Sequence, residues 1–211
     1  MGAARPERSA RAGLNAMADV FGLPILPGLT TAEGIVDADE ERALIARIDG
    51  AGLTPFRFQG WEGQRLTASF GFTYDFTRGR LERGEPIPEW LHPLRSRAAV
   101  FGRLAEDELV HALVIRYDPG ASIGWHRDRP AFEQVIGISL GASTTMRFRR
   151  RRGDRFERTG VPLPSRGIYS MIGEVRHEWE HSIAAMDETR WSVTFRTLSE
   201  NGEGRSPRSM Q

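Results

Sequence analysis

The stretch R-W-S-V-T-F-R, residues 190–196, alternates polar and apolar side chains without a break. Because successive side chains of a strand point to opposite faces, this alternation predicts a β-strand with two unlike faces. The polar face would carry Arg190, Ser192, Thr194 and Arg196. The apolar face would carry Trp191, Val193 and Phe195. Such a strand is typical of the wall of a binding site, with its apolar side against the layer behind it.

The sequence before this strand contains further short strands, separated by Gly, Pro and Asp turns. Those expected after Glu108 are LVHALVIRY (109–117), VIGISLG (135–141), TTMRFRRRR (144–152), DRFERTG (154–160) and GIYSMIG (167–173). Two helices are expected before them. Many short strands after a helical start predict a mainly β (α+β) protein, with a sandwich or jelly-roll core braced by N-terminal helices.

The first expected helix covers residues 30–48, with Thr30 or Thr31 as its N-cap. Its apolar stripe would consist of Ile35, Leu44, Ile45 and Ile48. The second covers residues 89–104, where apolar residues recur at helical spacing. We expect both stripes to pack into the core.

Length and composition fit one enzyme domain. The chain has 211 residues, a net charge of +1 and no cysteine, which excludes disulfides and thiolate chemistry. We expect a single domain over residues 23–199, between a disordered leader (1–22) and a disordered tail (200–211). No apolar run reaches the about 18 residues that a membrane helix needs, and no secretion signal is evident. We therefore expect a cytoplasmic protein. We also expect it to be a monomer.

Three side chains upstream of the alternating strand predict a metal site. His126 and Asp128 are two residues apart and share a strand face, and His181 follows after a long gap. Two imidazoles and one carboxylate are the ligands of non-haem Fe(II) oxygenases. The guanidinium groups of Arg190 and Arg196 suit the planar carboxylates of a dicarboxylate co-substrate. This combination favours an iron-dependent oxygenase.

A second motif overlaps this set. Residues 177–181 read H-E-W-E-H, which is the signature of a zinc metalloprotease helix, with His177 and His181 as ligands and Glu178 as the base. Strands on either side and Gly173 just upstream argue against a long helix here. The protease hypothesis also leaves Asp128 and the later arginines without a role. His177 would then lie at the rim of the site or on the exposed surface.

Three segments together resemble the AlkB family of Fe(II)/2-oxoglutarate-dependent dioxygenases. They are VIRYDPGASIGWHRD (114–128), RHEWEHSI (176–183) and RWSVTFR (190–196), and the resemblance extends over roughly residues 65–198. It implies a double-stranded β-helix (jelly-roll) core, with Fe(II) as cofactor and 2-oxoglutarate and O₂ as co-substrates. It also implies a nucleotide-recognition lid upstream of the core.

By position in the motif, the resemblance implies that His126, Asp128 and His181 bind iron. Arg190 would bind the distal carboxylate of 2-oxoglutarate, Arg196 would lie near the metal end, and Tyr117 would donate a hydrogen bond to the co-substrate. Ser192 and Thr194 lie between the arginines and complete the predicted co-substrate set. The sequence departs from the family pattern at three positions, Ile115 (often Asn), Pro130 (often acidic) and Ser182 (usually Gly).

Two regions point to the substrate. Seven arginines gather around a Gly153-Asp154 turn, and they could present a local positive field to phosphates or form a solvated edge hairpin: Arg147, Arg149, Arg150, Arg151, Arg152, Arg155 and Arg158. In the family, the region around residues 64–76 forms the lid over a flipped base. Its candidate contacts are Arg65, Phe70 and Tyr74, with a buried aromatic hairpin as the alternative.

These features predict an enzyme that oxidatively removes methyl groups from nucleic-acid bases, in DNA or RNA alkylation repair. The alternative is the same chemistry on a protein side chain or a modified tRNA base, which the change to Pro130 favours. A non-catalytic jelly-roll binding module is a third possibility, but it would leave the complete ligand set without a role.

Overall fold

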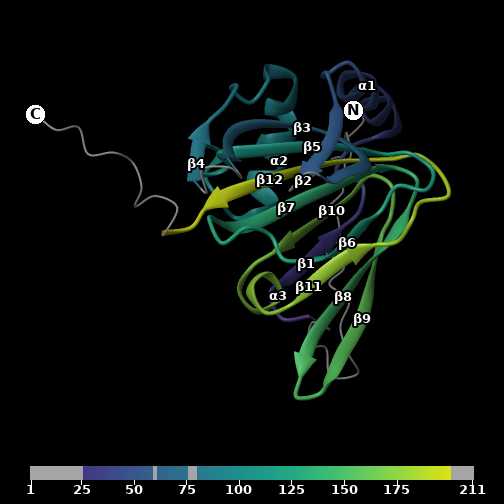
Figure 1. Ribbon diagram of the computed structural model, residues 1–211. Helices are drawn as coiled ribbons and strands as arrows, with labels where there is room; N and C mark the ends of the chain where they lie inside the picture. The colour runs from purple at the N-terminus through teal and green to yellow at the C-terminus, as the bar shows by residue number, and fades with distance from the viewer. Residues whose placement is uncertain (1–25, 59–60, 76–79, 201–211) are drawn as a thin grey trace, which may run out of the picture.

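The computed structural model describes residues 26–58, 61–75 and 80–200, and two antiparallel sheets form its body (Figure 1). The larger sheet has eight strands, in the order β1 (Leu29–Ala32), β10 (Gly167–Met171), β7 (Phe132–Gly141), β12 (Arg190–Leu198), β5 (His111–Tyr117), β3 (Trp61–Asp75) and β2 (Thr54–Phe58), with β4 (Arg80–Arg83) paired to β3. The smaller sheet has four, in the order β6 (Ile123–His126), β11 (Glu180–Ile183), β8 (Thr144–Arg152) and β9 (Arg155–Leu163). The predicted strands and mainly β architecture are confirmed.

Helices α1 (Ala38–Asp49) and α2 (His92–Gly102) cover one face of the larger sheet. Their buried side chains, including Ile48 and Leu94, pack in one cluster with Val193 and Phe195 of β12. The helices therefore brace the sheet from outside, as predicted. Short 3-10 turns at Glu89–Leu91 and Glu106–Glu108 flank α2. Among the described residues, no helix has the length and apolar character needed to cross a membrane.

The first predicted helix begins later than expected. Thr30 and Thr31 lie in β1, where they pair with Ser170 and Tyr169 of β10, so neither is a helix cap. The N-cap is Asp37, whose Oδ1 accepts hydrogen bonds from the backbone N–H groups of Asp39 (2.9 Å) and Glu40 (2.8 Å). Threonine suits both caps and strands, and here the open edge of β10 selects the strand.

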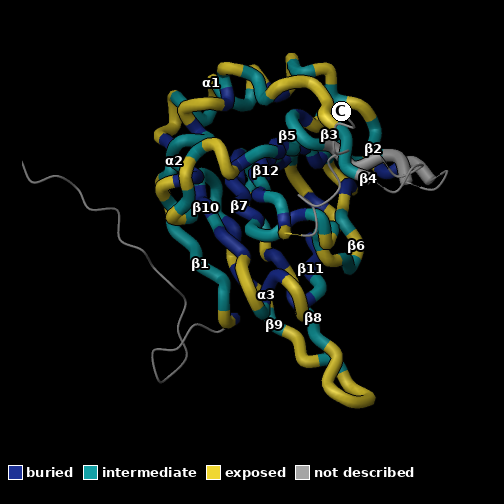
Figure 2. Tube along the Cα trace, turned by 90° about the vertical axis from the view of Figure 1, so that its left-hand side faces the viewer, coloured by how far each residue is buried: buried dark blue, intermediate teal, exposed yellow. Residues whose placement is uncertain are grey.

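The opposite face of the larger sheet lies against the smaller one. Two apolar clusters join the sheets, one containing Val135, Met146 and Phe148 and the other containing Ile115 and Ile183. The β8–β9 hairpin extends beyond this interface, and its far end is exposed (Figure 2). The predicted leader (1–22) lies outside the described residues, as does the predicted tail apart from Glu200.

Candidate functional site

The inward face of β12 is polar and almost completely buried. Arg190 is 1% exposed, and Ser192 and Thr194 are each 5% exposed. The intervening residues Val193 and Phe195 face the helices instead. The two unlike faces predicted from the alternating stretch are therefore confirmed, and the polar face looks into the space between the sheets.

The three predicted metal-binding side chains converge from two neighbouring strands. Antiparallel pairing of β11 with β6 sets His181 opposite His126, and their ring centroids are 4.2 Å apart. Nε2 of His181 lies 3.6 Å from Oδ2 of Asp128, which follows β6. Nδ1 of His126 lies 2.9 Å from the carbonyl oxygen of Gly124. Because a carbonyl only accepts, Nδ1 carries the proton, and the lone pair of Nε2 is free to bind a cation.

The charge states of these side chains suit a divalent cation. Burial lowers the pKa of His181 to about 3, with the neighbouring His126 acting in the same direction. Burial likewise lowers the pKa of His126. Burial would raise the pKa of Asp128, but the charge of Arg196 outweighs this effect and holds the pKa well below its usual range. Two neutral imidazoles and an ionised carboxylate are the forms in which these residues bind metals.

Arg196 holds the carboxylate in place. It donates to Oδ1 of Asp128 from both Nε (3.0 Å) and Nη2 (2.7 Å). Its Nη1 donates to Nδ1 of His111 (3.2 Å), since a guanidinium group has no acceptor. Nε2 of His111 therefore carries the ring proton and donates to Oγ of Ser69 (3.0 Å). A network thus runs from the exposed Ser69 of β3 to the buried carboxylate of Asp128 and leaves Oδ2 of Asp128 directed toward His181.

Sequence reasoning missed His111 and Ser69. The alternation in LVHALVIRY assigns His111 to the same face as Tyr117, and this was the available signal. Burial lowers the pKa of His111 well below its usual value, and the charge of Arg196 adds to this effect. The ring is therefore neutral, as an acceptor for Arg196 must be.

Arg190 is a buried cation with an unused donor. Its Nε donates to Oγ of Ser139 (2.9 Å), and its guanidinium carbon lies 5.3 Å from the ring centroid of Tyr117. Its Nη1 is buried, and it has no hydrogen-bond partner among the residues that the structure describes. An unsatisfied buried donor of this kind is costly, and a bound carboxylate would satisfy it.

The three predicted substrate contacts have different positions. The guanidinium carbon of Arg65 lies 4.1 Å from the ring centroid of Phe56. Nε of Arg65 is buried and has no hydrogen-bond partner among the described residues. The charge of Arg65 also lowers the pKa of His126. Arg65 is therefore near the site. Phe70 is 8% exposed and packs in the helix-facing core, so the prediction that it stacks on a base is wrong. Tyr74 lies in β3, but its side chain is outside the described residues.

The zinc-protease hypothesis is wrong. Helix α3 (Gly173–His177) has five residues and ends at His177, whereas His181 belongs to β11. The two histidines therefore do not lie one turn apart on a helix, as that motif requires. His177 is exposed, and its Nε2 lies 2.8 Å from Oε1 of Glu133.

The three departures from the family pattern have structural positions as well. Ile115 packs in the apolar cluster with Tyr117 and Ile183. The carbonyl of Pro130 accepts a hydrogen bond from Oγ of Ser199 (2.8 Å). Oγ of Ser182 accepts one from Nε of Arg147 (3.1 Å), on the outer face of the smaller sheet.

Comparisons with known proteins show the family of this chain. The family model of the 2OG-Fe(II) oxygenase superfamily matches residues 53–205. The tRNA (carboxymethyluridine(34)-5-O)-methyltransferase ALKBH8 of Mus musculus is 29% identical over 172 residues, which is 77% of this chain and 25% of that protein. Its counterpart in Macaca fascicularis is 30% identical over 166 residues, 74% of this chain and 24% of that protein. This chain thus spans about a quarter of the length of these relatives.

A viral protein and a solved structure are also similar. The uncharacterized protein L905 of Acanthamoeba polyphaga mimivirus is 28% identical over 125 residues, 53% of this chain and 59% of that protein. The structure of OsALKBH1 has the same jelly-roll fold, with a TM-score of 0.59 and 17% identity over 81% of this chain and 97% of that chain. The chain therefore belongs to the 2OG-Fe(II) oxygenase superfamily, as an AlkB-like 2-oxoglutarate-dependent dioxygenase that uses Fe(II), 2-oxoglutarate and O₂.

Proposed function

We propose that this dioxygenase removes methyl groups oxidatively from nucleic-acid bases. In this proposal His126, Asp128 and His181 hold Fe(II), and Arg190, with Tyr117, Ser192 and Thr194, binds 2-oxoglutarate. The observation that carries it is the unused Nη1 of the buried Arg190, on the strand whose other end, at Arg196, holds Asp128. A buried guanidinium with one unpaired N–H group and the converging side chains of His126, Asp128 and His181 face the same interior. Together they would suit the two ends of an iron-chelating dicarboxylate.

The chain's own residues supply geometry and exclude water. When bound, Fe(II) and 2-oxoglutarate activate O₂ for oxidation of a substrate C–H bond. Arg196 fixes one oxygen of Asp128, while Gly124 fixes the ring of His126. Arg190 would orient the co-substrate through a charge-assisted hydrogen bond that water cannot reach. If the oxidised carbon is an N-methyl group, the hemiaminal product collapses to formaldehyde and the unmodified base.

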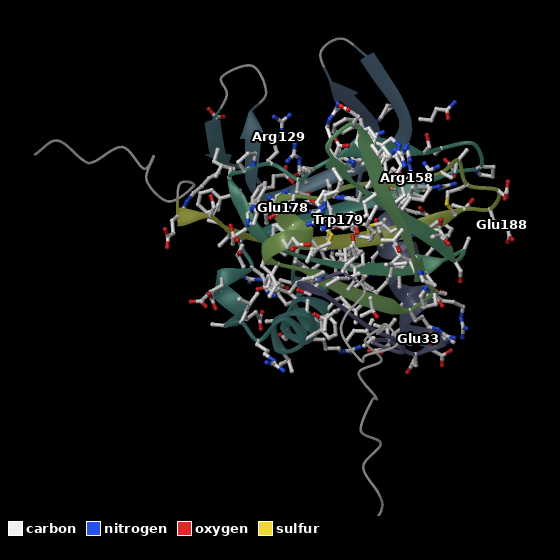
Figure 3. The ribbon with its side chains drawn as sticks, turned by 90° about the horizontal axis from the view of Figure 1, so that it is seen from below. Glu33, Arg129, Arg158, Glu178, Trp179 and Glu188 are labelled. Atoms are coloured by element: carbon white, nitrogen blue, oxygen red, sulfur yellow. The ribbon has the colours of Figure 1, made fainter. Side chains whose placement is uncertain are left out.

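The inner face of the β8–β9 hairpin does not support a role in substrate binding. Arg150 is paired on this face with carboxylates, donating from Nη1 to Glu174 (2.7 Å) and Glu178 (3.1 Å) and from Nη2 to Glu157 (3.1 Å). Its guanidinium carbon lies 4.6 Å from the ring centroid of Trp179. Figure 3, which views the molecule from the hairpin end, labels Glu178, Trp179 and Arg158. Arg150 is therefore not one of the hairpin arginines that could present a guanidinium group to phosphate.

The outer face of the smaller sheet has the opposite character. Arg147 and Arg149 lie over the ring of Trp125, at 5.4 and 4.6 Å from its centroid. Arg149, Arg151 and Arg158 lie around Phe156, at 4.6, 5.9 and 5.4 Å. Arg149 pairs with Glu180, whereas Arg147, Arg151 and Arg158 are exposed and have no ion-pair partner among the described residues.

This outer face supports a nucleic-acid partner. Exposed guanidinium groups interleaved with aromatic rings are suited to phosphates and unstacked bases. Trp125 is adjacent to His126 in β6, so the face lies directly behind the proposed iron ligands. A modified tRNA base is a second candidate substrate, because the ALKBH8 relatives are named for a tRNA uridine.

The test is anaerobic reconstitution with Fe(II) and 2-oxoglutarate, followed by O₂ and a matched substrate panel. The panel contains methylated single-stranded DNA, RNA and tRNA oligonucleotides, the same sequences without methyl groups, and methylated peptides. With at least one methylated oligonucleotide we expect formaldehyde and succinate in equal amounts. With the unmethylated control we expect no formaldehyde. Formaldehyde from peptides alone would reject a nucleic-acid substrate.

A further inference from the structure

A tyrosine from a distant strand reaches across the sheet into the candidate site. In the larger sheet, Thr194 of β12 pairs with Gly137 of β7, and Gly137 pairs in turn with Tyr169 of β10. A Cβ atom on Gly137 would lie 2.2 Å from Cζ and 2.3 Å from the hydroxyl oxygen of Tyr169. The phenol ring therefore lies directly over the backbone of Gly137, turned toward β12, and only glycine leaves room for it.

This position is central to the site. Thr194 lies between Arg190 and Arg196 on the inward face of β12, so the Tyr169 hydroxyl is next to the row that joins the two arginines. The ionisation of Tyr169 is coupled to groups at both ends. Burial raises the pKa of Tyr169 to about 12. Electrostatic interactions with Arg190 and Tyr117 at one end of the row, and with Asp128 and Arg196 at the other, also act on this pKa. The hydroxyl is thus a neutral donor among charged side chains.

An apolar side chain occupies the inward face of the neighbouring strand. Ile115, on the inward face of β5, pairs with Ser192 and packs in an apolar cluster, so it offers no hydrogen bond to a bound molecule. The hydroxyl of Tyr169 lies on the same inward face of the sheet as Ile115. The two residues come from opposite sides of β12, because the strand order is β10, β7, β12 and β5. The side chain of Ile115 therefore offers no donor on the β5 side, whereas that of Tyr169 offers a hydroxyl on the β10 side.

We propose that Tyr169 is a co-substrate-positioning residue whose hydroxyl donates a hydrogen bond to 2-oxoglutarate. Gly137 is its necessary partner, because any larger residue there would displace the ring. This inference rests on the proposed co-substrate site around Arg190. It assigns a role to two residues that lie outside the His-x-Asp, His and arginine motifs.

The experiment measures 2-oxoglutarate binding to the Mn(II)-loaded full chain without O₂, by calorimetry. Tyr169→Phe removes the hydroxyl and keeps the ring. A hydrogen bond to a charged group corresponds to a loss of affinity of roughly 10- to 100-fold, which we expect together with a matching rise in KM for 2-oxoglutarate, little change in kcat and an unchanged melting temperature. Gly137→Ala should lower the affinity in the same way, through displacement of the ring.

The matched control is Ser170→Ala, which removes a hydroxyl from the adjacent residue on the other face of β10. Oγ of Ser170 accepts a hydrogen bond from Nε2 of Gln134 (2.9 Å) and is remote from the inward face, so the substitution should reduce stability and leave 2-oxoglutarate affinity unchanged. An affinity within about twofold of wild type in Tyr169→Phe would overturn the inference and leave the proposed function standing. Failure of the wild type to bind 2-oxoglutarate would overturn both.

A measurement on the wild type covers the case in which Tyr169→Phe does not fold. The chain has three tyrosines, so labelling with tyrosine carrying ¹³C at Cζ gives three resonances, which Tyr74→Phe and Tyr117→Phe assign by elimination. Addition of 2-oxoglutarate to the protein loaded with diamagnetic Zn(II) should shift the Tyr169 resonance. A resonance that stays in place while 2-oxoglutarate binds would overturn the inference.

Discussion

The arginines of β12 and those of the β8–β9 hairpin show two uses of one side chain. Arg190 is buried and the side chain of Arg196 is 11% exposed, and their guanidinium groups are held by Ser139 and Asp128 in fixed orientations. The hairpin arginines Arg151 and Arg158 are exposed and lie around an aromatic ring. Burial makes each interior hydrogen bond strong and specific, whereas exposed guanidinium groups contribute mainly a local positive field that salt screens. The same residue type therefore predicts a co-substrate site in one region and a phosphate-binding surface in the other.

The largest expected effect lies in the interior, at the proposed iron ligands. His126→Ala should reduce 2-oxoglutarate turnover to background, because the remaining two ligands would not retain the metal. The matched control is His177→Ala, which removes an exposed imidazole and should retain activity. Succinate formation and iron content per protein measure both. An inactive His177→Ala beside an active His126→Ala would reverse the assignment.

Arg190→Lys tests whether the interior arginine acts through its shape as well as its charge. Lysine keeps the positive charge but loses the planar fork and the hydrogen bond to Ser139, so we expect 2-oxoglutarate affinity to fall by roughly 10- to 100-fold. Calorimetry on the Mn(II)-loaded protein gives the affinity, and Arg151→Lys on the hairpin is the control. Equal affinity in Arg190→Lys and wild type would remove the basis for the co-substrate site.

Arg150→Ala separates the inner face of the hairpin from its outer face. Its side chain is 11% exposed and pairs with three carboxylates that are themselves more exposed. We therefore expect a decrease of about 1–2 kcal/mol in the free energy of unfolding, with oligonucleotide affinity unchanged. Urea denaturation and fluorescence anisotropy give the two values. Weaker oligonucleotide binding in a fully folded variant would extend the binding surface to the inner face.

The sequence alone predicted most of what alternation controls. The spacing of Arg190 and Arg196 assigned both to the inward face of β12. The His-x-Asp pair predicted a shared strand face for His126 and Asp128, but β6 ends at His126, so Asp128 approaches the histidines from the segment after the strand. The strand signals were strong because each segment contains its own apolar periodicity. Thr30 was misassigned because cap and strand signals coincide in threonine, and only the pairing with β10 decides between them.

The face of a residue such as His111 could be predicted from alternation, but its partners on neighbouring strands could not. His111 meets Arg196 only because β5 pairs with β12, and Tyr169 crosses Gly137 only because β10 pairs with β7. Such pairings join segments far apart in the chain, and no local pattern encodes them. Arg150 and Arg151 are adjacent in the chain, yet Arg150 is paired with carboxylates and Arg151 is exposed. This difference arises because the face of the hairpin that carries Arg150 contacts α3.

The most direct test of the central comparison measures two affinities in two variants. The variants are Arg190→Lys and the double substitution Arg151→Ala with Arg158→Ala, and the affinities are for 2-oxoglutarate and for a single-stranded oligonucleotide across a salt series. We expect Arg190→Lys to weaken only 2-oxoglutarate binding. The double variant should weaken only oligonucleotide binding and flatten its salt dependence, by a slope of about 0.7 for each phosphate that the variant no longer neutralises. Weaker 2-oxoglutarate binding in the double variant, or an unchanged salt slope, would contradict the division of the arginines into two functions.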